Sequence, residues 1–493
     1  MPRSHFGRRH TALRHGEKDT IVTSASSSFT PAFAGNNASD KTVCIIGAGC
    51  SGITTAKRLK DYGIAFDCFE TSDDVGGNWY YNNPNGMSSA YQSLHIDTST
   101  TRLEFEDFPA PDHWPHFPHH TLMHQYFRDY VDHFGLRESI TFNTRVENAE
   151  RRPGGGWDIT LSTGETRTYD ALVVANGHHW NPHTPDYPGI FDGAIIHSHE
   201  YRSPTDPVDM HGSRVMVVGM GNSGLDIASE LSSRTVAEHV WVSARRGVWV
   251  LSKYRGGKPA DKMMMPPWMP KKLGLKISRR AIRKGIGNME DYGLPAPDHE
   301  PLAAHPSVSI DFLEKSGSGD LTCVPAIERF DGDAVILTDG QRITVDAIVF
   351  ATGYTMSFPF FDDRELHPDS EHRYPLFKRI IKPGVDDLYY AGLAQSSPTI
   401  VNLAEQQSKL IARHLVGEYQ LPSVAEMTEK IVHDEDKHLG QYYNARRHTI
   451  QIDFARYTRD LLAEIDAGEH RARGQVPPRP TLARRLLDKA GVQ

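Results

Sequence analysis

The chain has 493 residues, of which 24% are charged and 38% hydrophobic, the composition of an ordinary globular protein. Its formal net charge of -8 argues against nucleic acid as the main partner, because phosphate binding needs a basic surface. The four cysteines include no CxxC pair, and no run of about 18 apolar residues occurs, so we expect a cytoplasmic protein without disulfides or a transmembrane segment.

The first 40 residues differ from the rest of the chain. Residues 1–16 contain four arginines and no acidic residue, and the polar run SASSS follows. A basic, acid-poor start is typical of a mitochondrial targeting peptide, but this one lacks an apolar helical face. We therefore expect residues 1–40 to form a disordered N-terminal extension.

A glycine-rich turn follows the first strongly apolar run. Residues 42–47 (TVCIIG) predict a buried strand that leads into Gly47-Ala48-Gly49-Cys50-Ser51-Gly52 and a helix-like segment. Gly47 permits the tight turn, Gly49 lets the backbone approach a pyrophosphate, and Gly52 lets helix and strand pack closely. We expect these glycines and Ser51 to bind the diphosphate of a dinucleotide at the helix N-terminus.

The same pattern returns in the second half of the chain. Residues 214–219 (RVMVVG) lead into Gly219-Met220-Gly221-Asn222-Ser223-Gly224 and another helix-like segment. A lone motif is weak evidence, because composition alone gives roughly 0.3 chance matches in such a chain. Two motifs in strand–turn–helix context are strong evidence, so we expect Gly219, Gly221, Asn222, Ser223 and Gly224 to hold a second dinucleotide.

The similarity of the two halves continues downstream. The hairpin-like segments 161–165 and 337–341 lie 176 residues apart, and so do the strand-like segments that begin at Asp170 and Asp346. The long remainder of the chain suggests that it returns to complete the first domain. The predicted fold class is therefore α/β, with two Rossmann-like domains that each carry a β-meander, the second inserted in the first. We expect the first domain at 41–206 and, with C-terminal helices, at 346–493, and the second at 207–345.

The end of the second strand in each half indicates which nucleotide binds there. In the first half that strand closes on Glu70, whose carboxylate suits ribose hydroxyls and would repel a 2′-phosphate, which favours FAD. In the second half Ser243, Arg245 and Arg246 stand at this place. Arginines make charge-assisted bonds to a 2′-phosphate, which favours NADPH, although an exposed Arg pair without such a role is the alternative.

Over about residues 42–415 the sequence resembles the flavin-containing monooxygenase family. Besides the two glycine turns, the likeness rests on Gly76-Gly77-Asn78-Trp79, on the identifying pattern Phe191-x-Gly193-x-x-x-His197-x-x-x-Tyr201, and on Ala351-Thr352-Gly353-Tyr354. The resemblance implies that Gly77, Asn78, Trp79, Thr352 and Gly353 lie at the cofactors. A simple turn and core packing are the alternatives for Gly77 and Trp79, and we expect His197 to pin the inter-domain linker.

The resemblance implies an NADPH- and O2-dependent reaction. Hydride passes from NADPH to FAD, and the reduced flavin forms a C4a-(hydro)peroxyflavin that inserts one oxygen atom into a small organic molecule. The protonated form suits N- or S-oxygenation, whereas the anion attacks ketones in the Baeyer–Villiger reaction of related enzymes. The pair Tyr201-Arg202 favours the first alternative, because the Baeyer–Villiger pattern ends in Trp followed by Pro or Asp.

One residue departs from the family pattern. Asp97 stands where the family usually carries an Asn that is thought to stabilise the oxygenated flavin or to orient the substrate. An ionised Asp accepts hydrogen bonds but cannot donate one, so the departure weakens any inference about substrate class. Asp97 is our candidate catalytic residue, through a cation that it holds near the flavin. The alternative is that it caps the turn of Thr98-Ser99-Thr100.

Two other readings of the chain stay open. A disulfide reductase uses the same two folds but needs a redox cysteine pair, which the sequence does not offer. A redox sensor without oxygenation is the second reading, supported by the N-terminal extension and by residues 271–285, which hold seven Lys or Arg and no acid. Such a stretch is usually a solvated helix face, and the alternatives are that it steers NADPH or touches an anionic membrane surface. We expect no metal site, since the three histidines of 116–120 lack ligand spacing. A homodimer is an open alternative for the oligomeric state.

Overall fold

The computed structural model describes residues 40–263, 269–304, 307–368, 373–397, 399–439 and 450–476. The extension expected at the N-terminus lies, up to residue 39, outside the described residues. Across the ranges above, no helix is long and apolar enough to cross a membrane.

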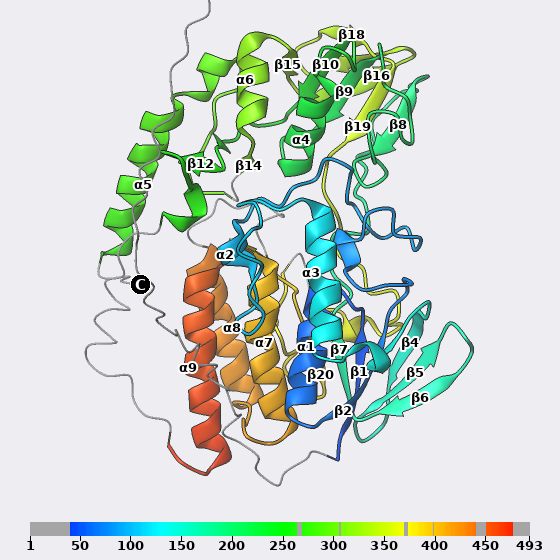
Figure 1. Cartoon of the computed structure of the whole chain (residues 1–493), viewed down its shortest axis with the longest axis vertical. Helices are drawn as coiled ribbons and strands as arrows, with labels where there is room; N and C mark the ends of the chain where they lie inside the picture. The colour runs from blue at the N-terminus through cyan, green and yellow to red at the C-terminus, as the bar shows by residue number, and fades with distance from the viewer. Residues whose placement is uncertain are drawn as a thin grey trace, which may run out of the picture. The chain divides into compact units, whose positions relative to one another are not determined.

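The first glycine turn belongs to a parallel five-stranded sheet (Figure 1). Its strands, in order across the sheet, are β20 (Leu388–Tyr390), β7 (Ala171–Val174), β1 (Thr42–Ile46), β2 (Ala65–Phe69) and β3 (Ile140–Thr141). Val43 and Ile45 of β1 pack among the helices, whereas Cys44 and Ile46 pack in a separate cluster with the β-meander. Both faces are covered, which is why the strand is apolar almost throughout rather than alternating.

The second glycine turn belongs to a second parallel sheet of the same kind. Its strands, in order, are β15 (Leu321–Val324), β10 (His239–Ser243), β9 (Arg214–Val218), β19 (Ala347–Phe350) and β8 (Ala194–His197). Strands β8 and β19 lie outside the range 207–345 expected for the second domain. The boundary differs because β8 pairs only with β19, which is distant in sequence, and no local pattern marks such a pairing.

Each sheet is accompanied by an antiparallel β-meander. The first is β4 (Val146–Arg151), β5 (Trp157–Leu161) and β6 (Thr166–Tyr169), and the second is β16 (Ile327–Asp331), β17 (Ala334–Leu337) and β18 (Arg342–Thr344). The turns predicted at 161–165 and 337–341 are present: the amide of Leu161 donates to Glu165 at 2.8 Å, and that of Leu337 to Gln341 at 2.9 Å. The predicted hairpins are confirmed.

The chain returns to the first sheet after the second is complete. Strand β20 pairs in parallel with β7, and the helices that follow pack back on the same domain. Helix α7 (Ile400–Leu415) packs against α1 (Cys50–Asp61), and α9 (Phe454–Ala472) packs against α7. This return is what the length of the C-terminal segment predicted.

The remaining elements connect or cover the two sheets. The helices are α2 (Thr100–Leu103), α3 (His120–His133), α4 (Asn222–Leu231), α5 (Lys271–Ile286), α6 (Ile310–Ser318) and α8 (Val424–Leu439). Short strand pairs are β11 (Val250–Leu251) with β14 (Ser307–Val308), β12 (Tyr254–Arg255) with β13 (Lys258–Pro259), and β21 (Gln395–Ser397) with β22 (Gln451–Asp453). Single turns of 3₁₀ helix occur at Gly77–Trp79, Arg137–Ser139, Ala260–Lys262, Met289–Tyr292 and Arg364–Leu366.

Candidate cofactor and oxygenation site

The three glycines of the first turn are needed for three different reasons. Gly47 has φ +98°, a conformation that side chains rarely adopt. A Cβ on Gly52 would lie 1.8 Å from the carbonyl oxygen of Gly47, so only glycine lets α1 approach β1. A Cβ on Gly49 would meet nothing closer than the Cα of Gly77, at 3.8 Å. The protein itself therefore leaves room at Gly49, as the close approach of a diphosphate requires.

The second turn repeats this geometry. Gly219 has φ +116°, and a Cβ on Gly224 would lie 2.2 Å from the carbonyl oxygen of Gly219. A Cβ on Gly221 would meet no atom within 4 Å. Helices α1 and α4 both begin directly after their second glycine, without a hydrogen bond from a capping side chain. Their first amides are thus available for an anion, so both turns fit a dinucleotide diphosphate.

Glu70 lies where β2 ends, beside the first turn. Its carboxylate accepts hydrogen bonds from the amides of Ala48 at 2.6 Å and Ser72 at 2.8 Å. Burial raises the pKa of this carboxyl group, and the two amides oppose the shift. The side chain is thus fixed at the end of the strand, in the position from which ribose hydroxyls are bound in this fold.

The segment Gly76–Trp79 packs on the first turn. The amide of Gly76 donates to Ala48 at 3.1 Å, and a Cβ on Gly77 would lie 3.2 Å from the Cα of Gly49. The side chain of Asn78 accepts hydrogen bonds from the amide and the hydroxyl of Ser89, both at 2.8 Å. Trp79 is partly buried against the core of the first domain. The structure therefore gives Asn78 and Trp79 packing roles in the first domain.

The residues expected to bind the 2′-phosphate do not share one environment. Ser243 ends β10, is buried, and donates to the carbonyl oxygen of Pro325 at 2.9 Å. The guanidinium of Arg246 donates to Asp298 at 2.6 Å. Arg245 is exposed, and its charge opposes the burial that raises the pKa of Tyr187. Farther along the turn, the side chain of Asn222 accepts from the amide of Val308 at 3.0 Å, and Ser223 is half-buried.

Thr352 and Gly353 lie where the two chain segments that join the domains run side by side. The hydroxyl of Thr352 donates to the carbonyl oxygen of His183 at 2.5 Å, and the amide of His183 donates to Gly353 at 2.9 Å. The ring of His197 packs edge-on against Tyr354, and burial lowers its pKa to about 4. A neutral, buried ring packed at the linker supports the structural role expected for His197.

Asp97 forms an ion pair with a lysine from the second half of the chain. Its carboxylate lies 2.9 Å from the Nζ of Lys253. Burial raises the pKa of Asp97, while the lysine opposes that shift. The amide of Ser99, which Asp97 could have capped, donates instead to Asp261 at 2.7 Å. The structure thus places a cation beside Asp97, which is the contact that the catalytic hypothesis assumes.

The Asp97–Lys253 pair lies beside an open cavity of about 400 Å³ whose lining includes Lys253 and Asp226. The phenol of Tyr91 donates to Asp226 at 2.6 Å. Burial and the charge of Asp97 raise the pKa of Asp226 to about 6. Sequence reasoning missed Lys253, Asp226, Tyr91 and Asp261, and no motif or spacing marks them, because contacts between the two halves bring them together.

Comparison with known proteins identifies the family. The flavin-binding monooxygenase-like family model matches residues 40–472. The flavin-containing monooxygenase 5 of Rattus norvegicus is 35% identical over 448 residues, which cover 86% of this chain and 82% of that protein. The chain belongs to the flavin-containing monooxygenase family.

Solved structures share the fold of this flavin-containing monooxygenase. S-allyl-L-cysteine S-oxygenase from Allium sativum matches with a TM-score of 0.62 and 24% identity, over 91% of both chains. A complex of OTEMO with FAD and NADP matches with a TM-score of 0.68 and 19% identity, over 86% of this chain and 97% of that one. The predicted fold, with one domain for FAD and one for NADPH, is confirmed. The protein is an oxidoreductase that uses FAD, NADPH and O2.

The cysteines of this monooxygenase do not suit disulfide chemistry. Cys44 and Cys68 are fully buried in β1 and β2, and burial raises the pKa of both thiols well above the usual value. Burial also raises the pKa of Cys50 to about 11. A redox pair needs an accessible thiolate, so the disulfide reductase alternative loses its chemical basis.

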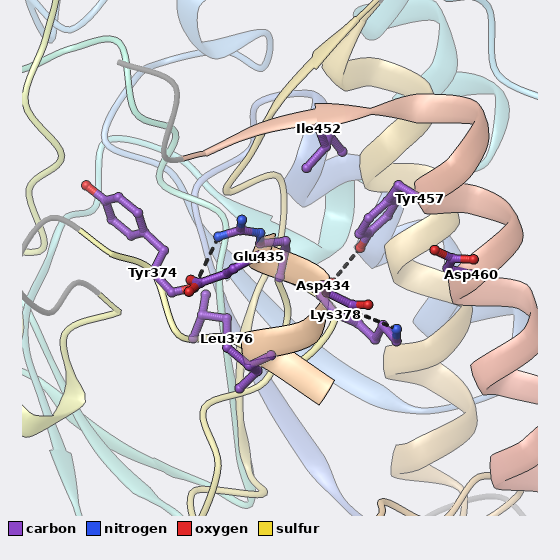
Figure 2. Close-up of a pocket in the computed structure, with 10 residues that line it drawn as sticks. Tyr374, Leu376, Lys378, Asp434, Glu435, Ile452, Tyr457 and Asp460 are labelled. Atoms are coloured by element: carbon purple, nitrogen blue, oxygen red, sulfur yellow. Dashed lines mark hydrogen bonds and ion pairs between the residues drawn. The ribbon is translucent and has the colours of Figure 1, made fainter. Parts of the chain in front are cut away.

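A smaller cavity lies among the C-terminal helices, shown in Figure 2. There the phenol of Tyr457 donates to the carbonyl oxygen of Lys378 at 2.6 Å. The side chain of Gln407 donates to Tyr457 at 3.0 Å and accepts from the amide of Gly392 at 2.8 Å. A Cβ on Gly392 would lie 2.0 Å from the hydroxyl of Ser51. The C-terminal helices thus support the first glycine turn from behind.

Proposed function

We propose that this enzyme oxygenates nitrogen or sulfur in a small organic molecule. The observation that carries the cofactor part of the proposal is the open space at Gly49 and Gly221, the second glycine of each turn, where a diphosphate would approach the backbone. Relatives support the reaction class: a rat protein 34% identical over 87% of this chain is named dimethylaniline monooxygenase, N-oxide-forming. The end of the family pattern at Tyr201-Arg202 also favours it.

The residues of the two turns would act by holding and orienting the cofactors. When bound, FAD and NADPH supply the hydride transfer and the activation of O2. Amides at the starts of α1 and α4 would bind the two diphosphates, and Ser51, Asn222 and Ser223 lie beside them. Glu70 would take the ribose of FAD, and Arg245 and Arg246 the 2′-phosphate of NADPH.

Baeyer–Villiger oxidation of ketones is the second candidate, and the Asp97–Lys253 ion pair favours it. A partly buried cation stabilises nearby negative charge more strongly than one in water, because the local dielectric is lower. Asp97 keeps the ammonium of Lys253 in place. Such a cation beside the oxygenation site would favour a deprotonated oxidant, which is the form that attacks ketones.

The test is product analysis with NADPH, O2 and matched panels of sulfides, tertiary amines and ketones. We expect N- or S-oxide products from the wild type. Asp97→Asn removes the charge that holds Lys253, so the ratio of ketone to sulfide products should fall, and the hydrogen peroxide formed per NADPH should change. Asp311→Asn, which lines the same cavity, is the matched control. An unchanged ratio and unchanged peroxide yield in Asp97→Asn would show that Asp97 is only structural.

We propose that the enzyme works in the cytoplasm, where its free cysteines stay reduced. Cell fractionation with an antibody against the chain tests this location. Light scattering on the FAD-loaded protein distinguishes a monomer from the homodimer that the sequence left open.

A further inference from the structure

Helix α5 (Lys271–Ile286) has one face fixed to the second domain. Ile282 is only 2% exposed and belongs to the core around β9 and β10. The guanidinium of Arg279 donates to the carbonyl oxygen of Pro301 at 3.0 Å. Arg283 pairs with Glu300 at 2.7 Å and lies over the ring of Trp249. These contacts define which side of the helix faces outward.

The outward face combines cations with large aliphatic side chains. Leu273 and Ile277 are 48% and 41% exposed, and their spacing of four residues places them side by side. Lys276, Arg280 and Lys284 follow one another at the same spacing, and all three are exposed. Helix α5 contains seven Lys or Arg and no acidic residue, although the whole chain has a formal net charge of -8. Positive charge is thus concentrated on one helix of an acidic protein.

We propose that α5 docks on a membrane surface that contains anionic phospholipids. The cations would contact the lipid phosphates, and Leu273 and Ile277 would enter the boundary between headgroups and acyl chains. An amphipathic helix with Lys or Arg beside exposed aliphatic side chains is the form that lies in this interface. A soluble polyanion would need the cations but not the aliphatic pair, and NADPH is too small to cover both. Docking of α5 is independent of the oxygenation reaction.

The test is co-sedimentation of the full-length, FAD-loaded enzyme with vesicles. One set contains phosphatidylcholine alone, and the other contains phosphatidylcholine with roughly a third phosphatidylglycerol. We expect binding to the anionic vesicles only, weakened by added salt. The double variants Lys276→Glu/Arg280→Glu and Leu273→Ser/Ile277→Ser should each lower the partition coefficient about 10-fold or more. Circular dichroism and NADPH oxidation should not change in either variant, since the outward face makes none of the contacts that fix the helix.

Two control variants replace exposed residues of the first domain. Arg145→Glu reverses one surface charge, which is half the charge change of the double variant, and Leu462→Ser, on α9, removes one exposed leucine; both should bind as the wild type does. Absence of wild-type binding to anionic vesicles would overturn the proposal. The proposal would also be overturned if the charge variant lost binding while the Leu273→Ser/Ile277→Ser variant kept it. Binding would then depend on charge alone, and a soluble polyanion or an acidic protein would be the better candidate ligand of α5.

Discussion

The two arginines after β10 should contribute unequally to NADPH binding. Arg246 already donates to Asp298 at 2.6 Å, so it must weaken that pair to reach a 2′-phosphate. Arg245 is exposed and has no ion pair with any residue in the described ranges, so it can turn to the phosphate without breaking one. A charge-assisted hydrogen bond contributes about 1.5–3 kcal/mol, which corresponds to roughly 10- to 150-fold in affinity. Arg245→Ala should therefore lower the affinity for NADPH by about this factor and leave the affinity for NADH unchanged.

Arg246→Ala is the matched variant. Its affinity for NADPH should fall less than about 10-fold, because Arg246 must give up its ion pair with Asp298 to bind the phosphate, and this cost offsets part of its contribution. The assay is a titration of the FAD-loaded enzyme with NADPH, NADH and 2′,5′-ADP, followed by the rate of flavin reduction. The ADP derivative carries the 2′-phosphate without the nicotinamide, so it isolates this contact. If Arg245→Ala left NADPH and 2′,5′-ADP affinity unchanged, or weakened NADH equally, another group would bind the phosphate.

Two further predictions concern the first domain. Gly49→Ala should fold normally but purify with little FAD, whereas Gly52→Ala should give little folded protein, because its Cβ would collide with the carbonyl oxygen of Gly47. The ratio of flavin to protein absorbance measures the FAD content, and circular dichroism measures folding. Full flavin content in Gly49→Ala would contradict the assignment of this turn to FAD. Burial raises the pKa of Glu405 on α7 to about 7. The contribution of this carboxyl group to stability is therefore fully present below the unfolded-state pKa near 4.5, and it is lost as the pH rises through the folded-state pKa. Glu405→Gln should therefore raise the free energy of unfolding by up to about 3 kcal/mol at pH 8 and hardly at pH 4. Denaturant titrations at the two pH values measure this difference, and an equal gain at both would refute the reasoning.

Local patterns in the sequence predicted the features that depend on local geometry. The glycine turns, the position of Glu70 and the hairpin turns each involve residues close in sequence, so spacing alone was informative. The contact of Ser99 with Asp261 spans 162 residues, and the pairing of β8 with β19 also joins distant segments. Such contacts depend on how two domains meet, and neither propensity nor periodicity carries that information. Lys253 could not be recognised as the partner of Asp97 for the same reason.

The way the second domain interrupts the first has a consequence for the order in which the chain folds during synthesis. The second sheet uses only strands between residues 194 and 350, so all of its strands have been made once residue 350 leaves the ribosome. The first sheet begins at β1 but needs β20, and the support behind Ser51 needs Gln407 and Tyr457. Domains fold as units as they are completed. The domain that starts first therefore closes after the second one, and FAD can be held firmly only once Tyr457 has been made.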